Sequence, residues 1–294
     1  MVLDVEELRM RYGTTDVLRG VTFQVGRGEV LAVLGPNGAG KTTTIEILEG
    51  FRLRSAGRVE VLGVDPAYGG ERWRARVGVV LQSWRDHGNW RVRELLAYLG
   101  SYYAGYSTEA IRRPWEADDL MAVVGLSAYA GRKVRMLSGG QRRRLDVAIG
   151  LVGRPELVFL DEPTAGFDPQ ARHEFHDLVR RLAERDQTTI LLTTHDLSEA
   201  ERVADRILIL SDGRIVAQGT AAELREQTPA DTEVRWRCGA QRFVRSTAQP
   251  ARLVAELFER SGGAITDLEV RRSTLEDSYL ALVRRAESAP AVAR

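Results

Sequence analysis

Residues 30–48 have the sequence VLAVLGPNGAGKTTTIEIL, and this stretch decides the fold. The apolar run at 30–34 is typical of a strand buried in a parallel sheet. A glycine-rich loop follows, and residues 43–49 predict a helix that Gly50 ends. A buried strand that leads through such a loop into a helix indicates an α/β protein that binds phosphate at the loop.

The loop matches the pattern G-x-x-x-x-G-K-[ST]. In this motif the backbone N–H groups curl around a β-phosphate, which also lies at the positive end of the helix. The ammonium of Lys41 reaches the β- and γ-phosphates, the hydroxyl of Thr42 ligates Mg²⁺, and Thr43 contacts a neighbouring phosphate oxygen. A chance glycine loop is the alternative, but the flanking strand and helix are the context that the motif requires. The predicted nucleotide loop consists of Gly35, Pro36, Asn37, Gly38, Ala39, Gly40, Lys41, Thr42 and Thr43.

Composition limits the class of protein. The 294 residues suffice for one large domain and a small one, and 44% of them are hydrophobic, so the chain can bury a core. There are 42 basic and 41 acidic residues, and this balance argues against a general nucleic-acid binder. Lys41 and Lys133 are the only lysines, so a lysine stands where phosphate binding needs one.

Cysteine content and hydropathy indicate where the protein works. Cys238 is the single cysteine, so no disulfide framework is possible, which suits a reducing cytosol. The opening residues MVLDVEELRM lack the regions of a signal peptide. Apolar runs such as VLAVL and ILIL are shorter than a membrane span. Any work at a membrane is therefore expected from the aqueous side.

Strands and helices alternate along most of the chain. Strands are predicted at 157–161 and 188–195, and helices at 170–185 and 197–203. This alternation predicts a mostly parallel sheet covered on both faces. Residues 92–153 are predicted to form a helical subdomain inserted between two of the strands.

The pattern changes after about residue 225. TEVRWRCG and RFVRST alternate like short strands, whereas ARLVAELFERSG and TLEDSYLALVRRA predict helices. We therefore predict a main domain over 1–225, a small α+β accessory domain over 226–286 and a disordered tail over 287–294.

The segment LVFLDEP, 157–163, is an apolar strand that ends in two carboxylates. Asp161 is placed to hold Mg²⁺ beside the nucleotide loop. Glu162 is predicted to point the other way, because strand side chains alternate, and to take a proton from the water that attacks the γ-phosphate. The alternative is a solvated strand end.

A second glycine turn opens the stretch LSGGQRRRLDVAIGL, 137–151. Ser138 is a good N-cap for the helix that follows, and the two glycines expose amides at its positive end. This pattern predicts an anion site without a lysine. An ordinary capped helix is the alternative.

The nucleotide loop, LSGGQ, LVFLDEP and His195 occur in the order found in ATP-binding-cassette (ABC) ATPases, and the resemblance covers about residues 2–225. It implies a P-loop NTPase cassette of the α/β class with a mostly parallel core sheet, an antiparallel β subdomain and a helical subdomain. It also implies that the ligands are ATP and Mg²⁺. Ser138, Gly139, Gly140 and Gln141 match the family's signature motif.

The resemblance assigns roles to further residues. Tyr12 matches the aromatic that stacks on adenine. Gln82 matches the glutamine that senses Mg²⁺ and the attacking water, and His195 matches the histidine that contacts the γ-phosphate. Asp168 matches the aspartate of a loop that crosses a dimer interface, although Phe167 stands where leucine is common. A surface tyrosine, a buried glutamine and a structural histidine are the alternatives.

The resemblance also implies an assembly. Two chains pair head to tail, and each ATP lies between the nucleotide loop of one and LSGGQ of the other; a homodimer is the simplest form, and a heterodimer stays open. The whole chain resembles the ATPase subunits of daunorubicin-type exporters, to which a separate permease supplies the membrane helices. We therefore expect an ATPase at the cytoplasmic face of the membrane that drives export of drugs, antibiotics or lipid-like molecules.

Three other functions are alternatives. Translation-associated ABC proteins carry two cassettes and a basic linker, and DNA-associated ones carry a long coiled coil; the sequence has neither. A regulatory protein that binds nucleotide without hydrolysis would not need Glu162 and His195. The partners expected are thus a second ATP-binding subunit and a permease, without nucleic acid.

Overall fold

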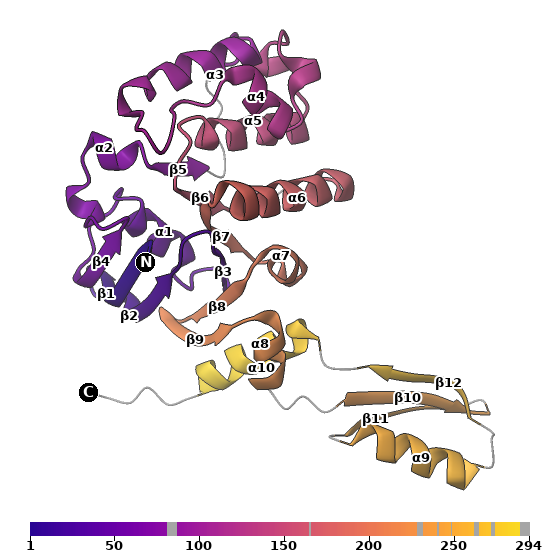
Figure 1. Ribbon diagram of the computed structural model, residues 1–294. Coiled ribbons are helices and arrows are strands. Elements are labelled where there is room, and N and C mark those ends of the chain that lie inside the picture. The colour runs from indigo at the N-terminus through magenta and orange to yellow at the C-terminus, as the bar shows by residue number, and fades with distance from the viewer. Residues whose placement is uncertain are drawn as a thin grey trace. The chain divides into compact units, whose positions relative to one another are not determined.

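The computed structural model describes residues 1–80, 87–164, 166–227, 232–239, 241–247, 249–261, 265–271 and 274–288 (Figure 1). The chain divides into two compact units, Met1–Ile215 and Val216–Arg294. This division falls ten residues before the domain boundary at 225, which stays a prediction.

Five strands of a six-stranded sheet with the order β5-β6-β7-β3-β8-β9 form the centre of the first unit, and the sixth, β9, continues past the boundary at Ile215. β3 pairs in parallel with β7 and β8, and β6 pairs in parallel with β5 and β7. Helices α1, α5, α6 and α7 pack against these strands, which explains why β3 is apolar and buried along its whole length. The strands are β3 (Val30–Leu34), β5 (Val77–Val80), β6 (Leu157–Asp161), β7 (Thr189–Thr194), β8 (Arg206–Ser211) and β9 (Arg214–Gly219).

Two helices of this layer begin where capping chemistry predicts. α6 (Pro169–Asp186) starts with proline, and α7 (Leu197–Val203) starts after Asp196, whose carboxylate accepts from the N–H groups of Ser198 and Glu199. α1 (Lys41–Leu48) begins directly after the glycine loop. All three helices therefore start at the edge where the parallel strands end.

A separate antiparallel sheet with the order β2-β1-β4 packs against the same core. Its strands are β1 (Leu3–Tyr12), β2 (Thr15–Val25) and β4 (Ala56–Val61). Leu3 and Leu8 of this sheet share one hydrophobic cluster with Ile45 of α1 and Phe159 of β6. The cluster holds the glycine loop between the two sheets.

The helical subdomain contains α3 (Val92–Ser101), α4 (Ala117–Val123) and α5 (Gly139–Leu151), which lie together at the top of Figure 1. Single 3₁₀ turns at Ala104–Tyr106, Ser127–Tyr129 and Val134–Met136 connect them. A further 3₁₀ turn, Pro66–Tyr68, and the short α2 (Glu71–Arg74) precede β5. The helices of the subdomain run from Val92 to Leu151, and the subdomain bounds of 92–153 stay a prediction.

The second unit holds a three-stranded antiparallel sheet with the order β11-β10-β12. Its elements are α8 (Ala221–Gln227), β10 (Thr232–Cys238), β11 (Gln241–Thr247), α9 (Pro250–Ser261), β12 (Ile265–Arg271) and α10 (Leu275–Ser288). α10 reaches Ser288, two residues into the predicted tail, and 289–294 lie outside the described residues. Within the described part of the chain, no helix combines the length and apolar character needed to cross a membrane.

Candidate nucleotide-binding site

The glycine loop lies between the carboxyl end of β3 and the first turn of α1. Gly38 and Gly40 have φ angles of +81° and +105°, a region that residues with a side chain rarely adopt. A Cβ on Gly35 would lie 2.2 Å from the carbonyl oxygen of Leu210. The loop thus needs its glycines both to turn and to pass close to β8.

Lys41 folds over this loop from the first position of α1. Its ammonium donates to the carbonyl oxygens of Gly35, at 2.8 Å, and Pro36, at 3.1 Å, and its side chain is buried. Burial lowers the pKa of Lys41, while the carboxylates of Glu162 and Asp161 act to raise it. The predicted lysine and the two predicted carboxylates therefore lie within electrostatic reach of one another.

Asp161 ends β6, and a residue of the neighbouring strand holds it. The hydroxyl of Thr193 on β7 donates to Oδ1 of Asp161 at 2.5 Å. The register pairs these two residues side by side. Thr193 was not predicted as a site residue; its only signal in the sequence is its place near the end of a strand that precedes His195.

Glu162 does not follow the strand alternation used to predict its direction. Its φ is +44°, so the strand geometry ends at Asp161 and both carboxylates act on Lys41. The N–H of Glu162 donates to the carbonyl and hydroxyl oxygens of Thr193, at 3.2 and 3.1 Å. Its Oε1 lies 3.3 Å from Nδ1 of His195, whose side chain is 69% exposed. The predicted base and the predicted histidine are thus adjacent.

Arg143 of α5 fixes the backbone of these carboxylates and was also missed. Its guanidinium is buried and donates to the carbonyl oxygens of Pro163 at 2.8 Å, Asp161 at 3.1 Å and Glu162 at 3.4 Å. Burial lowers the pKa of Arg143, and Asp146 leads the carboxylates that oppose this shift. Positions 142–144 are all arginine, so the sequence does not show which of the three is buried.

Ser138 caps α5, as predicted, and forms a capping box. Its hydroxyl accepts from the N–H of Gln141 at 3.3 Å, and Oε1 of Gln141 accepts from the N–H of Ser138 at 3.1 Å. Gly139 is exposed, and the N–H of Arg142 makes the first bond along the helix. The amides of Gly139 and Gly140 therefore face outward from the helix start.

Asp168 has a local role besides the predicted one at a dimer interface. Its Oδ1 accepts from the N–H of Ala171 at 2.8 Å and caps α6. The ring of Phe167 is buried and packs edge-to-face on Phe175, with centroids 5.9 Å apart. Phe167 thus contributes to packing.

Tyr12 ends β1 on the antiparallel sheet. Its side chain is 40% exposed, and the guanidinium of Arg52 lies 5.1 Å from the centre of its ring. One ring face is therefore occupied by the arginine. Gln82 lies outside the described residues.

The donor set fits a magnesium ion only together with a nucleotide. The Thr42 hydroxyl and the Asp161 carboxylate are hard oxygen donors of the kind that Mg²⁺ prefers. Among the described residues there is no group of three or more histidine, cysteine or acidic side chains that could hold a metal. Phosphate oxygens and water would have to complete the coordination.

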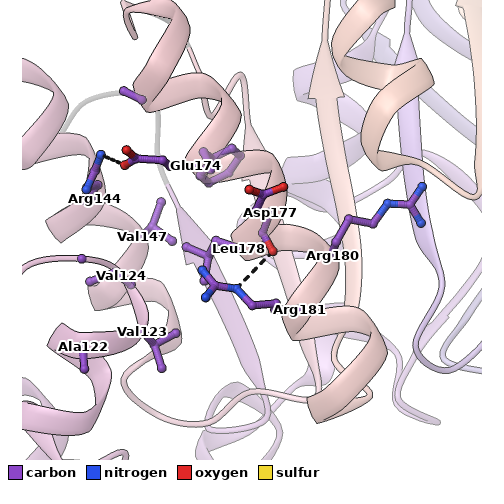
Figure 2. A pocket seen from close by; sticks show the side chains of 13 residues that line it. Ala122, Val123, Val124, Arg144, Val147, Glu174, Asp177, Leu178, Arg180 and Arg181 are labelled. Carbon is purple, nitrogen blue, oxygen red and sulfur yellow. Dashed lines mark hydrogen bonds and ion pairs between the residues drawn. The ribbon is translucent and has the colours of Figure 1, made fainter.

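A cavity of about 600 Å³ lies elsewhere, between α4, α5 and α6 (Figure 2). Arg144 and Glu174 form an ion pair at its wall, above the apolar Val147 and Leu178. None of the residues predicted to bind nucleotide lines it. It is therefore distinct from the loop, strand end and helix start described above.

Comparisons with known proteins find a matching family, relatives and solved structures. Residues 18–165 match the family described as "ABC transporter". A Nod factor export ATP-binding protein I of Ralstonia nicotianae is 43% identical over 223 residues, which are 76% of this chain and 68% of the relative. The daunorubicin resistance ATP-binding protein DrrA3 of Streptomyces coeruleorubidus is 41% identical over 229 residues, which are 78% and 71% of the two chains. A solved ATP binding subunit of an ABC transporter superposes with a TM-score of 0.67 at 30% identity, over 77% of this chain and 93% of the other.

Proposed function

Since the chain belongs to the ABC transporter family and carries its ATPase domain, we propose that two copies hydrolyse ATP between them and drive a separate transmembrane permease in export. One observation carries this proposal. Lys41, Asp161, Glu162 and His195 converge at the carboxyl edge of the core sheet, whereas the outward amides of Gly139 and Gly140 start another helix. A second chain can bring that helix start to the ATP bound at Lys41.

Each residue has a task in this proposal. Lys41 binds the β- and γ-phosphates, and the loop amides surround them. Glu162 takes the proton of the attacking water, while His195, 3.3 Å away, orients Glu162 and contacts the γ-phosphate. Mg²⁺ held by Thr42 and Asp161 would neutralise phosphate charge. The backbone N–H groups of Gly139 and Gly140 of the partner donate to the γ-phosphate, so bound ATP holds the dimer closed. Loss of the γ-phosphate on hydrolysis lets the dimer open.

The names of the relatives support export. The proteins from Ralstonia and Streptomyces are named for Nod factor export and daunorubicin resistance. We infer that the cargo is a drug, an antibiotic or a lipid-like molecule, and that the chain lies at the cytoplasmic face of the membrane through its permease.

Complementation between two defective chains tests the head-to-tail arrangement. Lys41→Ala and Ser138→Arg should each abolish turnover when they are the only chain present. In a mixed dimer, the intact Lys41 of one chain meets the intact Ser138 of the other, so one site is restored. Mixing the two variants should therefore recover phosphate release. A mixture as inactive as its components would contradict sites shared between chains.

A further inference from the structure

The two edge strands of the second unit differ in how well they are protected. In β12, Asp267 has a φ of +54° and the register against β10 shifts between Arg235 and Arg237. α9 packs against β10 and β12. β11 instead pairs with β10 along all seven residues without a shift. Irregularities such as the one in β12 prevent edge strands from pairing with other chains, and β11 has none.

β11 also exposes apolar side chains. Val244 is 61% exposed and Phe243 is 39% exposed. Val244 lies opposite Arg235, whose neighbour Val234 is fully buried on the other face of the sheet. Val244 therefore points to the charged, open face of the sheet.

The sequence of β11, QRFVRST, is complementary to itself. In an antiparallel pair with Val244 opposite Val244 of a second copy, Phe243 faces Arg245, Arg242 faces Ser246 and Gln241 faces Thr247. All seven residues find a partner, and arginine meets an aromatic ring instead of another arginine. A register centred on Arg242 or Arg245 would place like charges directly opposite, which is unfavourable.

We propose that β11 pairs with β11 of a second copy of this chain, antiparallel and with Val244 on the two-fold axis. Both copies use the same surface in this pairing, as a closed two-fold dimer requires. The pairing joins two three-stranded sheets into one sheet. It uses no residue of the nucleotide site, so it forms with or without ATP.

Cross-linking of the full chain without nucleotide tests the register. Val244→Cys in a Cys238→Ser background places two thiols opposite each other, where Cα atoms about 4.5–5.5 Å apart are within disulfide range. Val270→Cys is the matched control, because Val270 is 46% exposed on the other edge strand. Under mild oxidation V244C should form covalent dimers roughly tenfold faster than V270C, because pairing raises the effective thiol concentration.

Val244→Glu tests the same contact without a new bond. Within one chain the carboxylate faces Arg235, so the unit should stay folded, but at the axis two carboxylates meet. In sedimentation velocity without nucleotide, the dimer fraction should fall while thermal unfolding stays unchanged. Equal cross-linking of V244C and V270C would overturn the proposal, as would an unchanged dimer fraction for V244E.

Discussion

At the scale of single residues, the backbone of Glu162 is the most informative feature. A positive φ costs a residue with a side chain on the order of 1–3 kcal/mol, so neighbours must hold it. Thr193 accepts from its N–H, and Arg143 donates to its carbonyl oxygen. These hydrogen bonds from β7 and α5 stabilise the strained backbone of Glu162 and so hold its carboxylate near Lys41.

Removal of Arg143 should therefore impair the chemical step more than nucleotide binding. In Arg143→Met, Glu162 loses its support, and we expect kcat to fall roughly 10- to 100-fold while KM for ATP changes little, since the loop at 35–43 is untouched. Arg143→Lys keeps a buried donor and should recover part of the rate. Steady-state ATPase kinetics measure both, with thermal unfolding as the check on folding. A raised KM at normal kcat would rule out this role.

Glu49, next to the end of α1, makes stability depend on pH. Burial raises the pKa of Glu49 from 4.5 to about 8, and Asp161 and Glu46 add to the shift. Between these two values the folded chain holds a proton that the unfolded chain has lost. Stability should therefore be unaffected by Glu49 below pH 4.5 and should decrease as pH rises toward 8.

Glu49→Gln mimics the protonated carboxyl and should remove this slope. We expect the variant to be more stable than the natural chain by on the order of 3 kcal/mol near pH 7, with the difference vanishing toward about pH 4.5. Urea unfolding at several pH values measures it. Glu46→Gln removes one of the two carboxylates that add to the pKa shift of Glu49, so this variant should weaken the pH slope without abolishing it. A gain that is independent of pH would refute the burial argument.

At the scale of elements, α5 connects the helix start at Ser138 to the core sheet. It packs on β5, where a Cβ on Gly78 would lie 2.3 Å from the carbonyl oxygen of Gly150. A Cβ on Gly150 would in turn lie 2.6 Å from Cγ2 of Val80. At Gly78 the strand thus contacts the backbone of the helix, which cannot yield by a side-chain rotation.

Gly78→Ala should push the two elements apart. We expect a loss of about 1–3 kcal/mol in the free energy of unfolding, because an added methyl overpacks this contact. The control is Gly139→Ala, at the start of α5, where nothing lies within 4 Å of the new Cβ. This variant should leave stability nearly unchanged. Urea unfolding compares the two variants. Equal stabilities would mean that the α5–β5 contact tolerates expansion.

Element positions were predictable where a periodic pattern was intact. α9 and α10 coincide with the predicted helices, and β10 and β11 with the predicted strands. β12 was missed, because Asp267 with its φ of +54° interrupts the alternation of polar and apolar residues. The antiparallel sheet of β1, β2 and β4 came from the family resemblance, since the sequence order of strands does not say which strands pair.

At the scale of the whole molecule, the proposed mechanism depends on a second chain. The side-chain hydrogen bonds of Ser138 and Gln141 that the structure describes are with each other's backbone, and those of Lys41 are with its own loop. The two predicted anion-binding features thus form within one chain as separate parts. ATP between two copies is the proposed link.

Glu162→Gln should trap the closed assembly. The amide keeps the shape of the side chain but cannot accept the proton of the attacking water, so turnover should fall at least about 100-fold while ATP binding persists. In a Val244→Glu background, where β11 pairing is removed, the variant should shift from monomer to dimer when ATP and Mg²⁺ are added, and Lys41→Ala, which loses a phosphate ligand, should not respond to ATP. Normal turnover in E162Q would remove Glu162 as the base, and failure of E162Q to dimerise with ATP would contradict the closed assembly.

The sequence by itself determined the family, the α/β class, the glycine loop with Lys41, the acidic strand end and the capped helix start. Each of these is a short-range pattern, whose spacing suffices because loop, strand end and cap are built from consecutive residues. Only the tertiary structure decided how Glu162 is turned, which arginine of 142–144 is buried and that Glu49 is desolvated. These properties depend on contacts between α1, α5, β6 and β7, which are far apart in the chain and which packing alone brings together.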